Sequence, residues 1–83
     1  MKVAQVFSDK KRFLDLLLLA DEQEDMVDRY LERGEMFTLY DGGELRAACV
    51  VTNEGEGIYE LKNLATYPES QRKGYGRNLV EFL

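Results

Sequence analysis

Two glycine-bearing turns in the middle of the chain constrain its fold more than any other feature. The segments 41–44 (Asp-Gly-Gly-Glu) and 53–57 (Asn-Glu-Gly-Glu-Gly) place glycines beside acidic or amide residues, so both can adopt positive φ easily. The turns separate three apolar and β-branched runs, at residues 36–40, 45–52 and 58–66. The pattern predicts three consecutive antiparallel strands, and the last should end before Pro68, because proline has no N–H and a fixed φ.

Helical signals lie before and after these strands. Residues 2–7 predict a short strand, and Ser8-Asp9 predicts the cap of a helix that runs to about Ala20, with buried positions at 13, 14 and 16–18. Apolar residues recur at helical spacing from Gly74 or Tyr75 to Leu83, which predicts a last helix.

A second helix is predicted between the first helix and the three strands. Asp21 and Glu24 have the spacing of a capping box, so this helix should run from about Glu22 to Arg33 and end at Gly34. Its inner stripe should consist of Met26, Val27, Tyr30 and Leu31, with the acidic residues facing water. The predicted order β-α-α-β-β-β-α indicates one α/β (α+β) domain over residues 1–83.

Composition excludes several classes of function. The chain has 83 residues and a net charge of −5, which disfavours general nucleic-acid binding; residues 61–83 carry +2, and this suits a small anionic ligand better. It has no histidine and one cysteine, so it lacks the side chains of serine–histidine catalysis, the usual metal sites and an internal disulfide. No signal peptide or membrane-spanning run is present, and we therefore expect a cytoplasmic protein.

The segment Gln71-Arg-Lys-Gly-Tyr-Gly76 lies between the last strand and the last helix. The first N–H groups of a helix have no intrahelical partner, and glycine lets a phosphate approach the backbone. Arg72, Lys73 and Arg77 add positive charge, so the segment could hold a diphosphate. On spacing alone, an equally good interpretation is a basic loop exposed to solvent, followed by a helix that begins at a glycine. The P-loop and G-x-G-x-x-G patterns are both absent.

The motif in residues 60–83 resembles the central motif of the GNAT superfamily, the acetyl-CoA-dependent N-acetyltransferases. The matching residues are Leu64-Ala65-Thr66, then Pro68, Gln71, Gly74 and Gly76, followed by a helix. The predicted element order also matches the first half of that fold, in which the sheet is mixed but mostly antiparallel. The resemblance implies that the chain binds acetyl-CoA and transfers its acetyl group to a primary amine of an acceptor that we cannot name.

The resemblance also implies which residues bind the co-substrate. Backbone amides of Gln71 to Gly76 (Gln71, Arg72, Lys73, Gly74, Tyr75 and Gly76), with Arg77 beside them, would hold the diphosphate of coenzyme A. Backbone groups near Leu64, Ala65 and Thr66 would pair with the pantetheine arm, as an additional strand would. No metal is implied.

Acetyl transfer requires a base for the amine proton, and Glu60 matches the catalytic glutamate of some family members. A solvent-facing strand residue is the alternative interpretation of Glu60. Tyr59 and Asn63 should share one face of the strand, where they would line an acceptor pocket or simply pack. Cys49 should be a core residue.

Family members continue beyond this motif with further strands and a helix. We therefore expect residues 1–83 to represent the N-terminal half of an acetyltransferase domain, for which both an active and an inactive truncated chain stay open as alternatives. The strand 58–66 should then have an open edge, and open edges recruit other strands, so we expect self-association. The alternative to an enzyme is a non-catalytic fragment that binds coenzyme A or dimerises.

Overall fold

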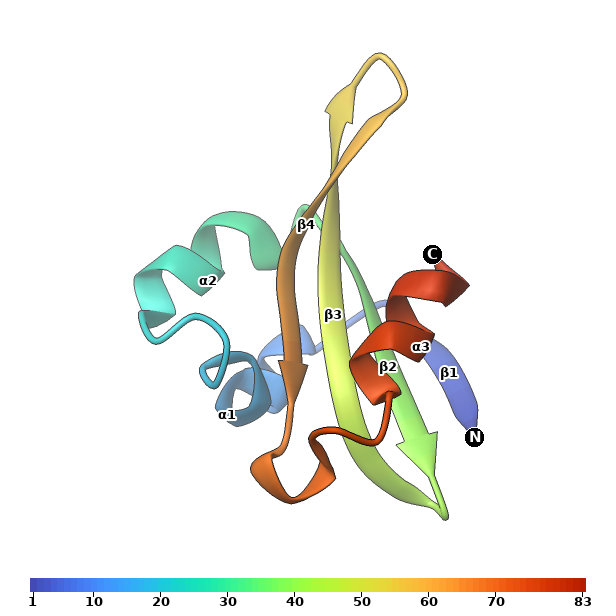
Figure 1. The fold of residues 1–83 in the computed structure, drawn as a ribbon. Helices are drawn as coiled ribbons and strands as arrows, with labels where there is room; N and C mark the ends of the chain where they lie inside the picture. Colours follow the sequence, from blue (N-terminus) through green and yellow to red (C-terminus); the bar gives the residue numbers. More distant parts are fainter.

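The three strands expected around the two turns form a sheet with the N-terminal strand. The computed structural model describes all of residues 1–83, and the strand order is β1-β2-β3-β4, so β1 and β4 are the edges (Figure 1). The strands are β1 (Lys2–Val6), β2 (Glu35–Asp41), β3 (Glu44–Gly55) and β4 (Ile58–Thr66). Every neighbouring pair is antiparallel, so the mixed character that the resemblance implied does not occur among these four strands.

Helices cover both faces of the sheet. The turn η1 (Lys10–Phe13), α1 (Leu14–Leu17) and α2 (Glu24–Leu31) lie on one face, while η2 (Pro68–Ser70) and α3 (Tyr75–Phe82) follow β4, with α3 on the other face (Figure 1). Two apolar clusters fill the layers. The larger packs Leu16, Leu17, Val27 and Leu31 against the sheet, and the smaller packs Tyr75 and Leu79. No helix is long and apolar enough to cross a membrane.

Both predicted turns are confirmed. Gly42 and Gly43 join β2 to β3 with φ of 63° and 78°, and Glu56 and Gly57 join β3 to β4 with φ of 56° and 76°. These positive φ values match the twist of a tight hairpin. β3 extends to Gly55, further than the apolar run indicated, because ladder pairing continues into the polar segment.

The first helical segment is shorter than predicted. It consists of η1 and a single turn of α1, and Asp9 makes no side-chain capping bond. The Leu17 carbonyl accepts hydrogen bonds from the N–H groups of Ala20 and Asp21 in the turn that follows, and one from the Asn63 amide at 3.0 Å. A tertiary contact from β4 therefore joins the local bonds at this end of the helix.

The capping box predicted for α2 is wrong. Gln23 precedes the helix without a side-chain cap, and the Asp21 carboxylate instead accepts a hydrogen bond from the Tyr30 hydroxyl at 3.2 Å. Met26 is 36% exposed rather than part of the inner stripe. Gly34 does follow the helix, but close packing explains it: an added Cβ would lie 2.7 Å from Val50 Cγ1.

A β-bulge at Lys62 interrupts β4. Val50 pairs with Asn63 and Val51 pairs with Leu61, so Lys62 has no partner of its own on β3. The bulge breaks the alternation of faces. Tyr59 points to the α3 face, whereas Asn63 is buried against α1 and α2, so the prediction that these two share a face is wrong.

Candidate functional site

The segment between β4 and α3 is held at both of its ends. Pro68 ends the strand as predicted and begins η2, and the buried Ser70 hydroxyl lies 3.5 Å from the Arg46 guanidinium. The Gln71 side-chain amide donates a hydrogen bond to the Thr66 carbonyl at 3.3 Å. The loop therefore starts from a fixed position beside the end of β4.

Six consecutive backbone N–H groups, those of residues 72–77, have no carbonyl partner in the protein. The first three belong to the loop and the next three to the first turn of α3, where intrahelical bonds have not yet begun. Gly74 has a φ of 82°, and an added Cβ would meet no atom within 4 Å, so its open side faces solvent. The α3 dipole adds partial positive charge at this end of the helix.

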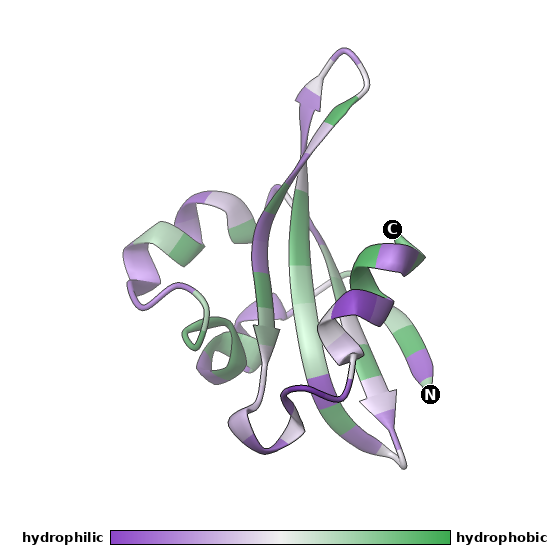
Figure 2. Ribbon diagram, viewed as in Figure 1, coloured by the Kyte–Doolittle hydropathy of each residue, from purple (hydrophilic) through white to green (hydrophobic).

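The side chains of this segment are strongly polar (Figure 2). Arg72 and Lys73 are exposed and form no ion pair, so both can approach an anion. Arg77 instead pairs with Glu81 at 2.8 Å, along α3.

Two residues of the predicted diphosphate loop differ from expectation. The N–H of Gln71 is already bonded to the Pro68 carbonyl, so this amide is not free for a ligand. A Cβ on Gly76 would lie in ordinary contact with Leu64 and Thr66, at 3.6–3.7 Å, and its φ is not positive. Neither strain nor a clash therefore requires glycine at position 76, whereas positive φ favours glycine at position 74.

Tyr75 points inward and connects the loop to the β2–β3 hairpin. Its hydroxyl donates a hydrogen bond to the Asp41 carboxylate at 2.7 Å, and the Arg46 guanidinium lies 6.0 Å from its ring centroid. The Tyr75 hydrogen bond lowers the pKa of Asp41, and the same bond raises the pKa of Tyr75. Sequence reasoning did not identify Asp41, Arg46 or Ser70 as supports of the loop, because Asp41 and Arg46 lie far from it in sequence and the burial of Ser70 depends on tertiary packing.

The outer edge of β4 has free backbone groups beside the loop. The Tyr67 N–H bonds to the Arg46 carbonyl, and ladder bonds alternate along an antiparallel pair. Ala65 therefore points its N–H and C=O toward β3, while Leu64 and Thr66 point theirs toward the open edge, where the Thr66 carbonyl already accepts the bond from Gln71. Of the three residues expected to pair with a ligand, two have the required orientation.

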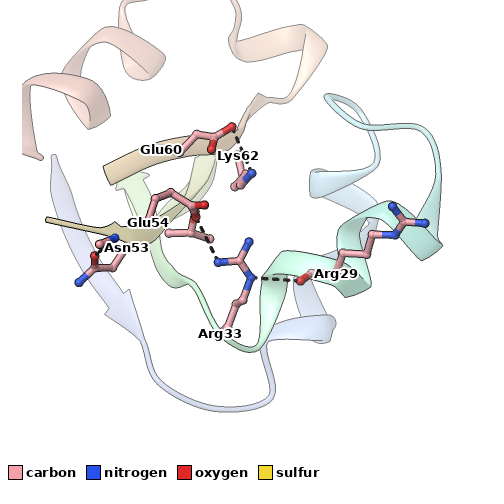
Figure 3. Close-up of polar contacts among 8 residues, drawn as sticks. Arg29, Arg33, Asn53, Glu54, Glu60 and Lys62 are labelled. Atoms are coloured by element: carbon pink, nitrogen blue, oxygen red, sulfur yellow. Dashed lines mark hydrogen bonds and ion pairs between the residues drawn. The ribbon is translucent and has the colours of Figure 1, made fainter. Parts of the chain in front are cut away.

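Glu60 lies in a polar cluster near the β3–β4 hairpin (Figure 3). Its carboxylate pairs with the Lys62 ammonium at 3.1 Å, and its side chain is 54% exposed. Beside it, Glu54 accepts hydrogen bonds from Thr52 and from Arg33, and these bonds lower the pKa of Glu54. Glu60 is thus accessible to solvent and lies far along β4 from the loop.

The buried face of β4 carries a hydrogen-bonded chain that the sequence did not reveal. The Asn63 amide donates to the Leu17 carbonyl and to the Tyr30 hydroxyl, both at 3.0 Å, and Tyr30 in turn donates to Asp21. Because a carbonyl can only accept, the nitrogen of Asn63 must face Leu17. The Asn63 Oδ1 atom is left buried without a partner.

Two other groups do not contribute reactive chemistry. Cys49 is buried in β3, and burial raises the pKa of its thiol to about 11, so it is protonated at neutral pH. No set of three or more His, Cys, Asp or Glu side chains is grouped so as to hold a metal ion.

Comparison with known proteins identifies the family. The model of the acetyltransferase (GNAT) family matches residues 3–83. The chain is 46% identical over 66 residues to the uncharacterized N-acetyltransferase YvbK of Bacillus subtilis (strain 168). The matched region covers 80% of this chain and 43% of that protein.

Solved structures agree with this match. A Bacillus subtilis acetyltransferase in complex with CoA superimposes with a TM-score of 0.85 and 38% identity, covering 95% of this chain and 52% of the other. A GNAT family acetyltransferase from Elizabethkingia anophelis with acetyl-CoA bound gives a TM-score of 0.89 at 27% identity. This match covers 98% of this chain and 53% of the other chain. The protein belongs to the GNAT family of acetyltransferases. The chain spans about half the length of these relatives.

Proposed function

We propose that residues 1–83 form the N-terminal part of a single N-acetyltransferase domain and bind acetyl-CoA through the loop before α3. The observation that carries this proposal is the run of six unpartnered N–H groups at residues 72–77. In the proposed complex these groups hold the diphosphate, and Arg72 and Lys73 supply charge. Two related structures that contain CoA or acetyl-CoA support the choice of ligand.

The pantetheine arm would continue from the loop along the open edge of β4. The outward N–H and C=O of Leu64 and the outward N–H of Thr66 offer it hydrogen bonds of the kind that an added strand makes, whereas the Thr66 carbonyl already accepts a bond from the Gln71 side chain. Ala65 contributes to this site by packing alone, because its backbone groups pair with β3.

The proposed reaction transfers acetyl to a primary amine. The neutral amine nitrogen attacks the thioester carbonyl, the C–N bond forms as the C–S bond breaks, and coenzyme A leaves as a thiolate. Glu60 is the proposed base for the amine proton, directly or through water. Its carboxylate is exposed and forms an ion pair with Lys62, so an acceptor amine or a water molecule can reach it. We place the reaction in the cytoplasm, where the free thiol of Cys49 stays reduced.

Isothermal titration calorimetry of the 83-residue chain with acetyl-CoA tests the proposal, with ATP as a second polyphosphate. We expect saturable binding of acetyl-CoA that Gly74→Asp abolishes, because the new carboxylate faces the diphosphate and φ of 82° strains any side chain.

Gly57→Asp is the matched control. Gly57 has a φ of 76° with open space around it, but it lies in the β3–β4 hairpin. If both variants bind acetyl-CoA as tightly as the parent chain, the diphosphate does not lie on the loop. If the folded parent does not bind, the chain is better interpreted as a non-catalytic fragment.

We further propose that the chain by itself self-associates through the edge of β4. Ile58 and Tyr59 are exposed on this edge, and no strand covers it. Light scattering over a range of protein concentrations would show a rising mass, and a constant monomer mass would contradict the proposal.

A further inference from the structure

The loop between η2 and α3 has few hydrogen bonds of its own. Gln71 is bonded to Pro68 and Thr66 where the loop begins, but the N–H groups of residues 72–74 have no partner in the protein. Arg72 has a φ of 65° and Gly74 a φ of 82°, so two residues of the loop are left-handed. A non-glycine residue is strained in this region and keeps it only where the surrounding structure imposes it. The conformation of the loop therefore depends on contacts from outside it.

Arg46 contacts residues on both sides of the loop. Before the loop, its carbonyl accepts a hydrogen bond from the Tyr67 N–H at 3.3 Å, and its guanidinium lies 3.5 Å from the Ser70 hydroxyl. After the loop, the same guanidinium lies 6.0 Å from the centroid of the Tyr75 ring. One residue of β3 thus fixes the positions at which the loop begins and ends.

Asp41, the last residue of β2, holds the second of these positions. Its carboxylate accepts the hydrogen bond from the Tyr75 hydroxyl at 2.7 Å, and its carbonyl accepts one from Arg46 Nε at 3.3 Å. Both residues belong to the β2–β3 hairpin, which lies at the same end of the sheet as the loop (Figure 1). The loop is therefore attached to a part of the sheet that is itself held by ladder pairing.

Neither residue is placed to bind an anion directly. All three guanidinium nitrogens of Arg46 already have partners. Nε donates to the Asp41 carbonyl and Nη1 lies beside the Ser70 hydroxyl, while Nη2 pairs with the Glu44 carboxylate at 3.2 Å. Glu44 compensates the charge of Arg46, and the carboxylate of Asp41 repels a diphosphate. A contribution of these two residues to binding therefore acts through the loop.

We propose that Arg46 and Asp41 are positioning residues for coenzyme A, which hold the loop in its binding conformation without touching the ligand. This inference rests on the proposed function, because it takes the amides of the loop as the diphosphate site. A loop that is already ordered does not have to be ordered when the ligand binds. Ordering the backbone of one residue costs about fivefold to thirtyfold in an equilibrium constant. Loss of the Arg46 contacts should therefore weaken binding about tenfold.

The test is isothermal titration calorimetry of the 83-residue chain with CoA, for the parent, Arg46→Lys and Tyr75→Phe. Lysine keeps the charge of Arg46 but cannot bridge the same three partners, so we expect about tenfold weaker binding. Tyr75→Phe removes only the bond to Asp41 and should weaken binding less; it answers the same question if Arg46→Lys does not fold. Arg33→Lys is the matched control, because Arg33 is also ion-paired, with Glu54 at 3.2 Å near the far end of β3.

Backbone order parameters of residues 72–74, measured by NMR relaxation without ligand, separate positioning from a general loss of stability. We expect them to fall in Arg46→Lys and Tyr75→Phe and to keep the parental values in Arg33→Lys. Parental affinity for CoA in both loop variants overturns the inference and leaves the proposed function intact. Weaker binding with unchanged order parameters also overturns it, because the residues then act on the ligand directly. No binding of CoA by the folded parent overturns both proposals.

Discussion

Lys10 shows how a single side chain can stabilise a junction between elements. It is 7% exposed, and its ammonium donates hydrogen bonds to the carbonyls of Leu31, Glu32 and Gly34, at 2.6–3.3 Å. These carbonyls follow the last turn of α2, where helices lack intrahelical donors and favour positive charge. Lys10 thus ties η1 to the far end of α2.

Replacing Lys10 by Met should therefore destabilise the protein by about 2–3 kcal/mol, because buried carbonyls lose a charged donor. Urea unfolding followed by circular dichroism measures the change. Lys11→Met is the control. Lys11 pairs with Glu24 and Asp28 on the surface, so this substitution should lower the free energy of unfolding much less. Equal effects of the two variants would show that the Lys10 contacts contribute nothing specific.

The Tyr75–Asp41 hydrogen bond should make stability depend on pH. The pKa of Asp41 is lowered in the folded state. Its contribution to the free energy of unfolding is therefore present at neutral pH and is lost as pH falls through that lowered pKa. The pKa of Tyr75 is raised, so its contribution is present below the ordinary tyrosine pKa and is lost as pH rises through the raised value.

Urea midpoints of the parent and of Tyr75→Phe, measured from acid to alkaline pH, test this dependence. The two curves should differ most near neutrality and converge at both extremes. Tyr59→Phe, an exposed tyrosine without such a partner, should follow the parent throughout. A constant difference between parent and Tyr75→Phe would exclude a titrating hydrogen bond.

At the scale of elements, the bulge in β4 decides which face each side chain joins. Because Lys62 is inserted, Asn63 faces α1 while Leu61 faces α3. A regular strand with the same residues would place Leu61 and Asn63 on one face.

Insertion of one alanine between Val50 and Val51 should give Lys62 a partner on β3, restore regular pairing and move the side chains of residues 58–61 to the opposite face of the sheet. Leu61 and Tyr59 would then leave the α3 face, and we expect a loss of stability of more than about 2 kcal/mol, as for other disruptions of a buried network. Urea unfolding together with hydrogen exchange of β4 measures both effects. Insertion of one glycine after Gly57, in the hairpin turn, is the control and should leave β4 pairing unchanged. A variant with alanine inserted between Val50 and Val51 that keeps parental stability would contradict this role for the bulge.

At the scale of the whole molecule, ligand binding and self-association should compete. Both proposals use the open edge of β4, and a ligand that binds only the monomer shifts the equilibrium toward it. Light scattering should therefore show a lower mean mass when acetyl-CoA is added, whereas ATP at the same concentration should have less effect. An increase in mass with acetyl-CoA would show that association and binding use different surfaces.

The sequence by itself determined the elements that depend on local chemistry. Both hairpin turns, the end of β4 before Pro68 and the start of α3 after Gly74 follow from backbone preferences of neighbouring residues, and the structure confirms them. The motif from Leu64 to Gly76 likewise sufficed to indicate the family, because loops of this kind act through backbone geometry that glycine and proline set locally.

Only the tertiary structure decided the features that depend on contacts between distant residues. The Tyr30 bond to Asp21 replaced the capping box that the local pattern predicted, and the Asn63 amide at the end of α1 and the Lys10 ammonium at the end of α2 are further contacts that no local pattern indicated. The bulge at Lys62 also escaped sequence analysis, because an inserted residue is visible only against its partner strand. A side chain finds its hydrogen-bond partner by proximity in space, and that proximity exists only once the sheet and helices have packed.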